Sequence, residues 1–80
     1  MKEVRENQRQ REIGRIRLND NQDIVVSIVD NEKLDIRVFV KSDSYTGPTK
    51  RGVRFYLLND NWTEFKKLID QVDKVYEEIA

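Results

Sequence analysis

The sequence predicts an α+β domain in which a four-stranded antiparallel sheet is followed by one C-terminal helix, in the order β-β-β-β-α. Four segments between residues 12 and 58 alternate apolar and polar side chains or are rich in β-branched residues, as strands are. Polar stretches too short for a crossover helix separate them, and such connections join antiparallel neighbours. Beyond residue 60, apolar residues recur every three or four positions, which indicates an amphipathic helix.

The chain is expected to form one small domain behind a short arm. Eighty residues are too few for two domains. Residues 1–11 hold only two apolar side chains, Met1 and Val4, among many charges. Such a segment cannot bury enough surface to offset the entropy lost on ordering, so we expect a disordered arm. The folded domain is expected to span residues 12–80.

The first two expected strands form a hairpin. Residues 12–18 alternate between apolar and basic side chains, and residues 24–29 are β-branched in five of six positions. The polar residues 19–23 are expected to form the turn. The core face of the hairpin is expected to hold Ile16, Leu18, Ile24, Val26 and Ile28.

The third and fourth strands are expected at residues 34–41 and 52–58. Residues 42–50 contain the only Pro and one of three Gly, so we expect a surface loop between them. The core face of these two strands is expected to hold Leu34, Ile36, Val38, Val40, Val53, Phe55 and Leu57.

A helix is expected from Asn61 onward, where Asn61 and Glu64 fit a capping box. Its apolar stripe consists of Trp62, Phe65, Leu68, Ile69, Val72, Val75, Tyr76 and Ile79. Because this stripe is wider than a small sheet face needs, we expect a twofold homodimer formed through the helix. The alternative is that all eight side chains lie in the core of the monomer.

One helix covers one face of a sheet, so the second face is expected to be open to water. By alternation this face holds Arg15, Arg17, Val25, Ser27, Val29, Asp35, Arg37, Phe39, Lys41, Arg54 and Tyr56. Five of these eleven residues are cationic and two are aromatic. Single-strand binding needs this combination, because cations follow phosphates while bases stack on rings. The alternative is a solvated face on which basic and acidic side chains pair across strands.

The composition excludes several classes of site. Without Cys or His, the chain cannot build a zinc finger, an iron–sulfur site, a disulfide, or a Ser-His or Cys-His catalytic pair. We therefore expect a protein that is not an enzyme and uses no metal and no cofactor. No apolar run approaches the roughly 20 residues of a membrane span, and the polar start lacks a secretory signal, so we expect an intracellular protein with no membrane segment.

Three segments together resemble a known family. They are Leu34-Asp35-Ile36-Arg37, the segment GPTKRGV at residues 47–53, and the helix start Asn61-Trp62 followed by FKKLI at residues 65–69. This set is similar to the transcriptional coactivator "positive cofactor four" family and its bacterial and viral relatives, over roughly residues 12–75. The resemblance implies a β-β-β-β-α protomer, a homodimer joined through its helices, and binding of single-stranded or melted DNA along the sheet and its basic loop.

The same resemblance implies roles for individual residues. Arg37 looks like the family's strand arginine that meets the DNA backbone, and Lys50 with Arg51 looks like its basic pair before the glycine, here Gly52. Trp62 resembles a packing residue. Better-studied members stack bases on aromatic residues near the ends of strands two and three, where this chain has Ile28 or Val29 and Val40. Stacking is therefore expected from Phe39, Tyr45 or Tyr56, unless a bulge turns Phe39 inward.

The resulting prediction is a homodimeric single-stranded DNA-binding protein of low sequence specificity. We expect it to act as a transcription coactivator-like factor, or as an accessory factor in replication or recombination, with that machinery as a further partner. The expected nucleic-acid contacts are Arg15, Arg17, Arg37, Phe39, Lys41, Lys50, Arg51, Arg54 and Tyr56. The expected dimer interface is Trp62, Phe65, Ile69, Val72 and Tyr76. Two alternatives are a dimeric protein-interaction module that binds no nucleic acid, and an RNA-binding relative of the Pur-alpha or Whirly type.

Overall fold

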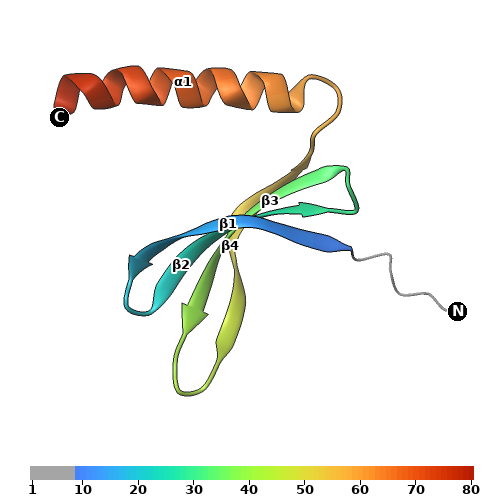
Figure 1. Cartoon of the computed structure of the whole chain (residues 1–80), viewed down its shortest axis with the longest axis vertical. Coiled ribbons are helices and arrows are strands. Elements are labelled where there is room, and N and C mark those ends of the chain that lie inside the picture. Colours follow the sequence, from blue (N-terminus) through green and yellow to red (C-terminus); the bar gives the residue numbers. More distant parts are fainter. Residues whose placement is uncertain (1–8) are drawn as a thin grey trace, which may run out of the picture.

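The computed structural model of the protein describes residues 9–80. Within them lie β1 (Gln10–Asn19), β2 (Gln22–Val29), β3 (Lys33–Lys41), β4 (Thr46–Tyr56) and α1 (Asn61–Ile79). The strands form one antiparallel sheet in the order β1-β2-β3-β4, followed by the helix (Figure 1). The predicted fold class and order of elements are therefore confirmed. Residues 1–8 of the expected arm lie outside the described residues, and Gln10 and Arg11 belong to β1.

The turn between β2 and β3 depends on residues that tolerate a left-handed backbone. Asp30 and Asn31 have φ angles of 57° and 59°. Apart from glycine, Asn and Asp adopt this region most readily, because their short polar side chains bond locally. The chain therefore reverses tightly, and Val29 pairs with Lys33 directly across the turn.

The fourth strand is longer than predicted. It begins at Thr46, so only residues 42–45 of the expected loop connect β3 to β4, and it ends at Tyr56, two residues before the predicted end. Pro48 lies inside β4. Proline donates no backbone hydrogen bond, and β4 tolerates it because this strand forms one edge of the sheet.

The helix α1 begins at Asn61 as predicted, but its N-terminus is capped differently. The N-cap is Asp60, which has a left-handed φ of 67° and makes no capping hydrogen bond through its side chain. The Asn61 side chain instead donates through Nδ2 to the Tyr56 carbonyl at 2.9 Å. The predicted capping box of Asn61 and Glu64 is therefore wrong, because the tight connection brings a free carbonyl at the end of β4 within reach of Asn61.

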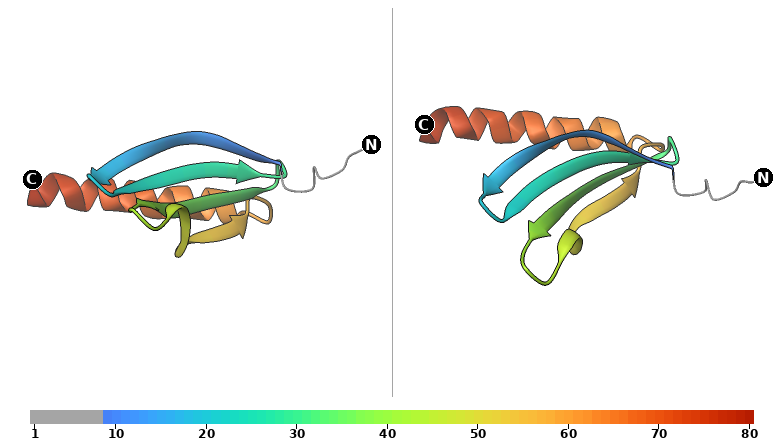
Figure 2. Two further views of the ribbon diagram at one scale, coloured as in Figure 1. Left: turned by 90° about the horizontal axis from the view of Figure 1, so that it is seen from below. Right: turned by 60° about the horizontal axis from the view of Figure 1, so that its bottom comes forward.

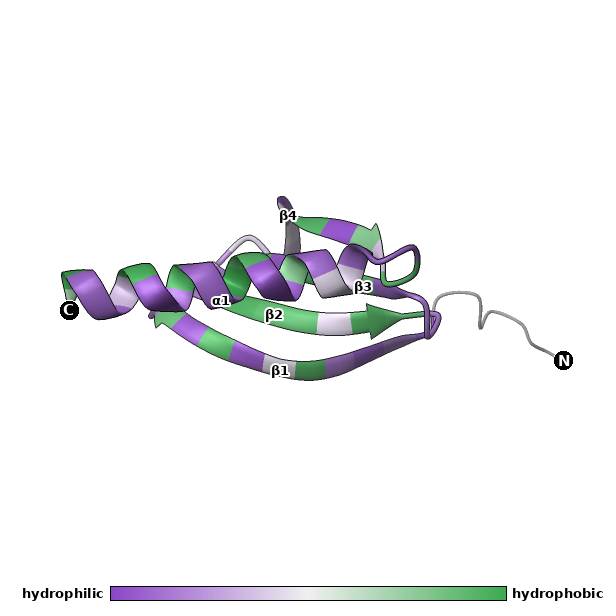
Figure 3. Ribbon diagram, turned by 90° about the horizontal axis from the view of Figure 1, so that it is seen from above, coloured by the Kyte–Doolittle hydropathy of each residue, from purple (hydrophilic) through white to green (hydrophobic). Residues whose placement is uncertain are grey.

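The helix packs against the sheet near its own N-terminal end. The ring of Phe65 lies 5.3 Å from that of Phe55 in β4 and 6.1 Å from that of Trp62, between ring centroids. Farther along, α1 runs past the sheet, and its C-terminal end extends beyond the strands (Figures 1 and 3). No residue of α1 is buried in the single chain. The apolar stripe therefore does not form a core within one protomer.

The burial of the two sheet faces differs from the prediction, although Leu34 on the expected core face is buried as predicted, at 5% exposed. The strand register confirms which residues share a face, but the face expected to be open holds Val25, Ser27, Val29 and Asp35, each exposed by 2% or less. Long side chains from the flanking strands cover them, as Arg15 and Arg37 do on either side of Val25. The expected core face is less protected, because the helix leaves much of it uncovered. Ile16 and Val53 on that face are 61% and 51% exposed. The helix runs along one side of the sheet, and the strands fan out away from it (Figure 2).

Candidate nucleic-acid interface

The strand register brings most of the predicted binding residues onto one face of the sheet. Antiparallel partners point to the same side, so the cross-strand rows define this face. The rows are Arg15, Val25, Arg37 and Gly52, then Arg17, Asp23, Phe39 and Pro48, then Glu12, Ser27, Asp35 and Arg54. Tyr56 lies at one end of the face in a row with Lys33, and Lys41 pairs with Thr46 at the other. We call this surface the cationic face.

A buried carboxylate occupies the middle of the cationic face. Asp35 is 1% exposed, and its Oδ1 accepts hydrogen bonds from Arg37 Nη2 at 2.8 Å and Arg54 Nε at 3.0 Å. Burial raises the pKa of Asp35, but the bonds from the two guanidinium groups more than offset this effect and hold its pKa below the usual value. Two of the predicted phosphate-binding cations are therefore already paired within the protein.

Beside this network, β4 contains a bulge of three residues. Arg37 pairs with Gly52 and Phe39 pairs with Pro48, so Thr49, Lys50 and Arg51 lie opposite Val38 alone. The Thr49 hydroxyl donates to the Val38 carbonyl at 2.8 Å and accepts from the Arg51 amide at 3.1 Å. We call residues 49–51 the basic bulge. It makes Lys50 and Arg51 protrude from the edge of the sheet, and both are exposed.

Gly52 returns the chain from the basic bulge into register. Its φ is 153°, a conformation that residues with a Cβ rarely adopt. A Cβ at this position would lie 2.2 Å from the Ile36 carbonyl oxygen, so the two strands approach closely only because residue 52 has no side chain. Gly52 therefore lies within β4, where it ends the bulge, and does not mark the start of the strand.

Arg15 and Phe39 form a second paired cluster. The Arg15 guanidinium lies 5.5 Å from the centroid of the Phe39 ring. It also donates to Glu12 at 2.8 Å and to Asp23 at 3.1 Å, and the Glu12 bonds are the main cause of the raised pKa of Arg15. Phe39 stays on the cationic face, since the bulge occurs in β4 and not in β3. One side of its ring is therefore covered by a cation whose charge is already compensated.

Four of the predicted binding cations, Arg17, Lys41, Lys50 and Arg51, lie toward the end of the sheet that holds the β1–β2 and β3–β4 turns. Lys41, Lys50 and Arg51 form no ion pair with any residue from 9 to 80. Arg17 has only a 3.9 Å contact with the fully exposed Asp20, and such surface pairs contribute little. A small cavity of about 130 Å³ opens in this region, lined by Arg15, Asn21, Asp23, Phe39, Val40, Lys41 and Thr46. We call this part of the molecule the hairpin end.

Two tyrosines that were candidates for stacking are placed differently. Tyr45 lies at the hairpin end, half-exposed, and its hydroxyl donates to the Pro48 carbonyl. Tyr56 lies near the opposite end of β4, where Lys33 Nζ is 5.3 Å from its ring centroid. The role of Thr49 in holding the basic bulge was not predicted from the sequence. The only signal for it was its position just before the Lys50-Arg51-Gly52 motif. The role of Asp35 as the partner of the two arginines was also not predicted.

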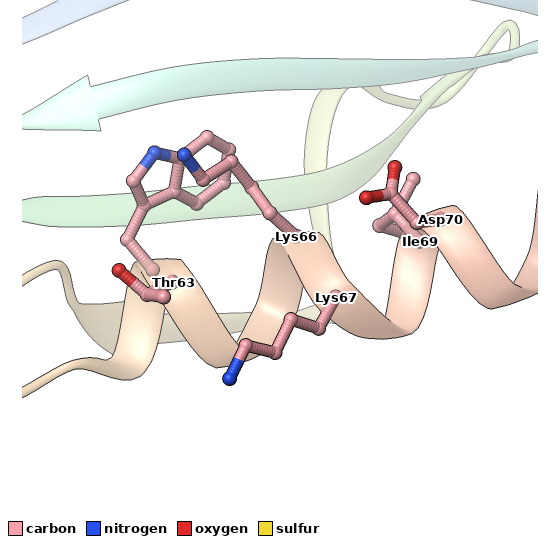
Figure 4. Close-up of a pocket in the computed structure, with 6 residues that line it drawn as sticks. Thr63, Lys66, Lys67, Ile69 and Asp70 are labelled. Carbon is pink, nitrogen blue, oxygen red and sulfur yellow. The ribbon is translucent and has the colours of Figure 1, made fainter.

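The helix presents a second surface, which is apolar. Apart from Phe65, which packs on Phe55, the residues of the stripe are exposed by between 38% for Trp62 and 77% for Ile79. Hydrophobic bands recur along α1 (Figure 3). A hollow of about 380 Å³ lies on this helix beside Trp62, where Lys66 Nζ is 5.7 Å from the indole centroid while Lys67 points away (Figure 4). Four of the five predicted interface residues, Trp62, Ile69, Val72 and Tyr76, are therefore exposed in the single chain, whereas Phe65 packs against β4.

Comparison of the chain with family models, curated protein sequences and solved structures found no significant match. Over residues 9–80, no three acidic side chains converge as they would to hold a metal ion. In the same part of the chain, α1 is not apolar enough over its length to span a membrane.

Proposed function

We propose that the protein is a homodimer that binds single-stranded DNA with low sequence specificity through the cationic face and basic bulge. The observation that carries this proposal is the group of four cations at the hairpin end, Arg17, Lys41, Lys50 and Arg51, which have no strong acidic partner among residues 9–80. These cations lie on three of the four strands, β1, β3 and β4, so a phosphate backbone that crosses the sheet can meet all of them. Phe39 and Tyr45 lie toward the same end of the sheet.

The arrangement favours a single strand over a duplex. The cations lie along short strand ends and a bulge, whereas the major groove of a duplex admits a helix or a two-stranded ribbon that reads base edges. Single-strand binding by cations and rings tolerates many sequences, because every base has a π-face. The proposed role is that of an intracellular accessory factor where single strands are exposed, as in transcription, replication or recombination.

The homodimer is supported by the surface of α1. Seven of the eight residues in the stripe are at least 38% exposed. Large exposed apolar patches mark interaction sites, and a second copy of the same helix presents a matching apolar surface that would cover the stripe. Trp62, Phe65, Ile69, Val72 and Tyr76 are the residues proposed to meet the partner.

The test is a titration of fluorescent single-stranded DNA, duplex DNA and RNA of equal length at several salt concentrations. Four phosphate contacts per protomer should give a slope of roughly −3 for log K against log salt. Lys50→Ala should reduce the slope by about 0.7 for all sequences, because one contact is lost. The control Lys74→Ala removes the same charge from the helix and should leave the slope unchanged.

Different outcomes select between the functions. Tighter binding of RNA than of DNA would favour the RNA-binding alternative. No salt-sensitive binding to any probe would overturn the proposal and leave a protein-interaction dimer. Sedimentation equilibrium tests the dimer separately, since one chain has a mass of 9.6 kDa.

A further inference from the structure

The network around Asp35 fixes the orientation of two arginines. A carboxylate that is 99% buried and accepts from two guanidinium groups is costly to leave unpaired, so both contacts are strongly maintained. Arg37 lies closest, because Nε and Nη2 both point at the carboxylate, with distances of 2.8–3.3 Å. The planar guanidinium is therefore held in one orientation.

Held in this orientation, Arg37 reaches the basic bulge with its other terminal nitrogen. Nη1 donates to the Thr49 carbonyl at 3.0 Å. The Arg37 side chain is 20% exposed, so little of it is accessible to a ligand. Arg37 thus connects the buried carboxylate of β3 to the first residue of the bulge in β4.

The bulge needs such support, because it interrupts the backbone ladder between β3 and β4 over three residues. Besides the Arg37 contact, it is held by the two bonds of the Thr49 hydroxyl. If the bulge were flexible, a ligand that ordered it would lose affinity to the conformational entropy of that ordering. A bulge that is already ordered in the folded protein has lost this entropy on folding.

We propose that Asp35 and Arg37 are positioning residues, which hold the basic bulge so that Lys50 and Arg51 present their charges to the phosphates of a single strand. This inference rests on the proposed function and deepens it. In this arrangement Arg37 acts through the Thr49 carbonyl, and the phosphates are bound by the two exposed cations.

The first test uses the conservative variant Arg37→Lys beside Arg37→Ala. Lysine keeps the charge but lacks the fork that spans Asp35 and Thr49. If Arg37 positions the bulge, both variants should lose at least about fivefold in affinity for a fluorescent dT oligonucleotide, since two long side chains must then be ordered on binding. If Arg37 instead binds a phosphate as a charge, lysine should retain affinity within about twofold, which would overturn the inference.

The second test asks whether the Asp35→Asn substitution raises or lowers the affinity for single-stranded DNA. Asp35→Asn adds one positive charge to the cationic face, so simple electrostatics predicts tighter binding. Loss of the anchor for Arg37 predicts weaker binding, and we expect the weaker binding. Because Asp35→Asn can also impair folding, a second variant, Thr49→Val, is needed. It changes no charge, removes both hydrogen bonds of the Thr49 hydroxyl and leaves Asp35 intact. It should weaken binding as well, and unchanged affinity in Thr49→Val together with tighter binding in Asp35→Asn would refute the positioning role.

A third measurement needs no DNA. In ¹⁵N relaxation experiments, the amides of Lys50 and Arg51 should show order parameters near those of the strands in the wild type and fall below about 0.6 in Arg37→Lys and Arg37→Ala. Lys74→Ala should leave them unchanged. If the wild type binds no oligonucleotide, the proposed function fails while these order parameters still decide the positioning role. If they do not change in either Arg37 variant, the inference fails even when DNA binds.

Discussion

Replacing Gly52 with alanine should destabilise the fold by about 3 kcal/mol or more. At its φ of 153°, an added Cβ would meet the Ile36 carbonyl oxygen at 2.2 Å and the Arg37 Cα at 2.8 Å. A strained positive φ costs roughly 1–3 kcal/mol. The clash involves backbone atoms of β3, so relief requires loosening the β3–β4 ladder, at about 0.5–1.5 kcal/mol for each hydrogen bond lost.

Gly14 in β1 provides the matched control. An added Cβ there meets no heavy atom within 4 Å, and Gly14 is not among the glycines with positive φ. Gly14→Ala should therefore be neutral or slightly stabilising, because alanine loses less backbone entropy on folding. Both variants keep the charge and the helix unchanged, so they differ only in the backbone environment of one methyl group.

Urea denaturation followed by far-ultraviolet circular dichroism measures the difference. All proteins must be compared at one concentration, because the stability of a dimer depends on it. At roughly 4–8 °C per kcal/mol for a domain of this size, Gly52→Ala should also melt on the order of 12 °C or more below Gly14→Ala. Equal stability of the two variants would show that the β4 backbone at Gly52 does not lie close to the Ile36 carbonyl of β3.

Three further predictions concern other parts of the molecule. Ile69→Lys should shift the sedimentation mass from dimer to monomer while single chains keep their sheet signal, and an unchanged dimer would contradict the proposed helix interface. Phe39→Ala should lower single-strand affinity by about 1–3 kcal/mol, whereas a stability loss of about 3–5 kcal/mol without a binding defect would indicate a purely structural ring. Because the pKa of Asp35 is lowered in the folded state, its ionised carboxylate should stabilise the fold at pH values above its ordinary pKa of 3.8. This stabilisation should be lost as the pH falls through the lowered pKa. The stability difference between the wild type and Asp35→Asn should therefore close in acid, and a constant difference to pH 2 would contradict this account.

The order of elements could be predicted because it depends on local periodicity. Alternation in residues 34–41 and the three-to-four spacing after Trp62 depend only on neighbours in the chain. Assignment of Arg15, Arg37 and Phe39 to one face follows from the same alternation, and the register confirms it. The β4 boundary was missed, because the Gly and Pro of residues 47–48 favour a loop by local criteria, and only the edge position of the strand accommodates them.

The candidate site was predictable only in part. The Lys50-Arg51-Gly52 motif indicated a basic segment. Which cations remain unpaired could not be deduced, because Arg54 meets Asp35 across 19 positions of sequence and Arg37 meets Thr49 across 12. The pairing depends on a register that includes the bulge, and no local pattern specifies that register.

The sequence by itself determined which side chains share a face, where the helix lies in the chain, and that zinc-finger, iron–sulfur, disulfide and Ser-His or Cys-His chemistry are excluded. Only the tertiary structure decided which face is protected, which charges cancel, and which residues protrude. The physical reason is that alternation records the direction of each side chain, whereas burial and ion pairing depend on what strands and helix place beside it. On the cationic face, long side chains from β1 and β3 flank Val25 and Val29 and protect them, whereas α1 leaves much of the apolar face uncovered.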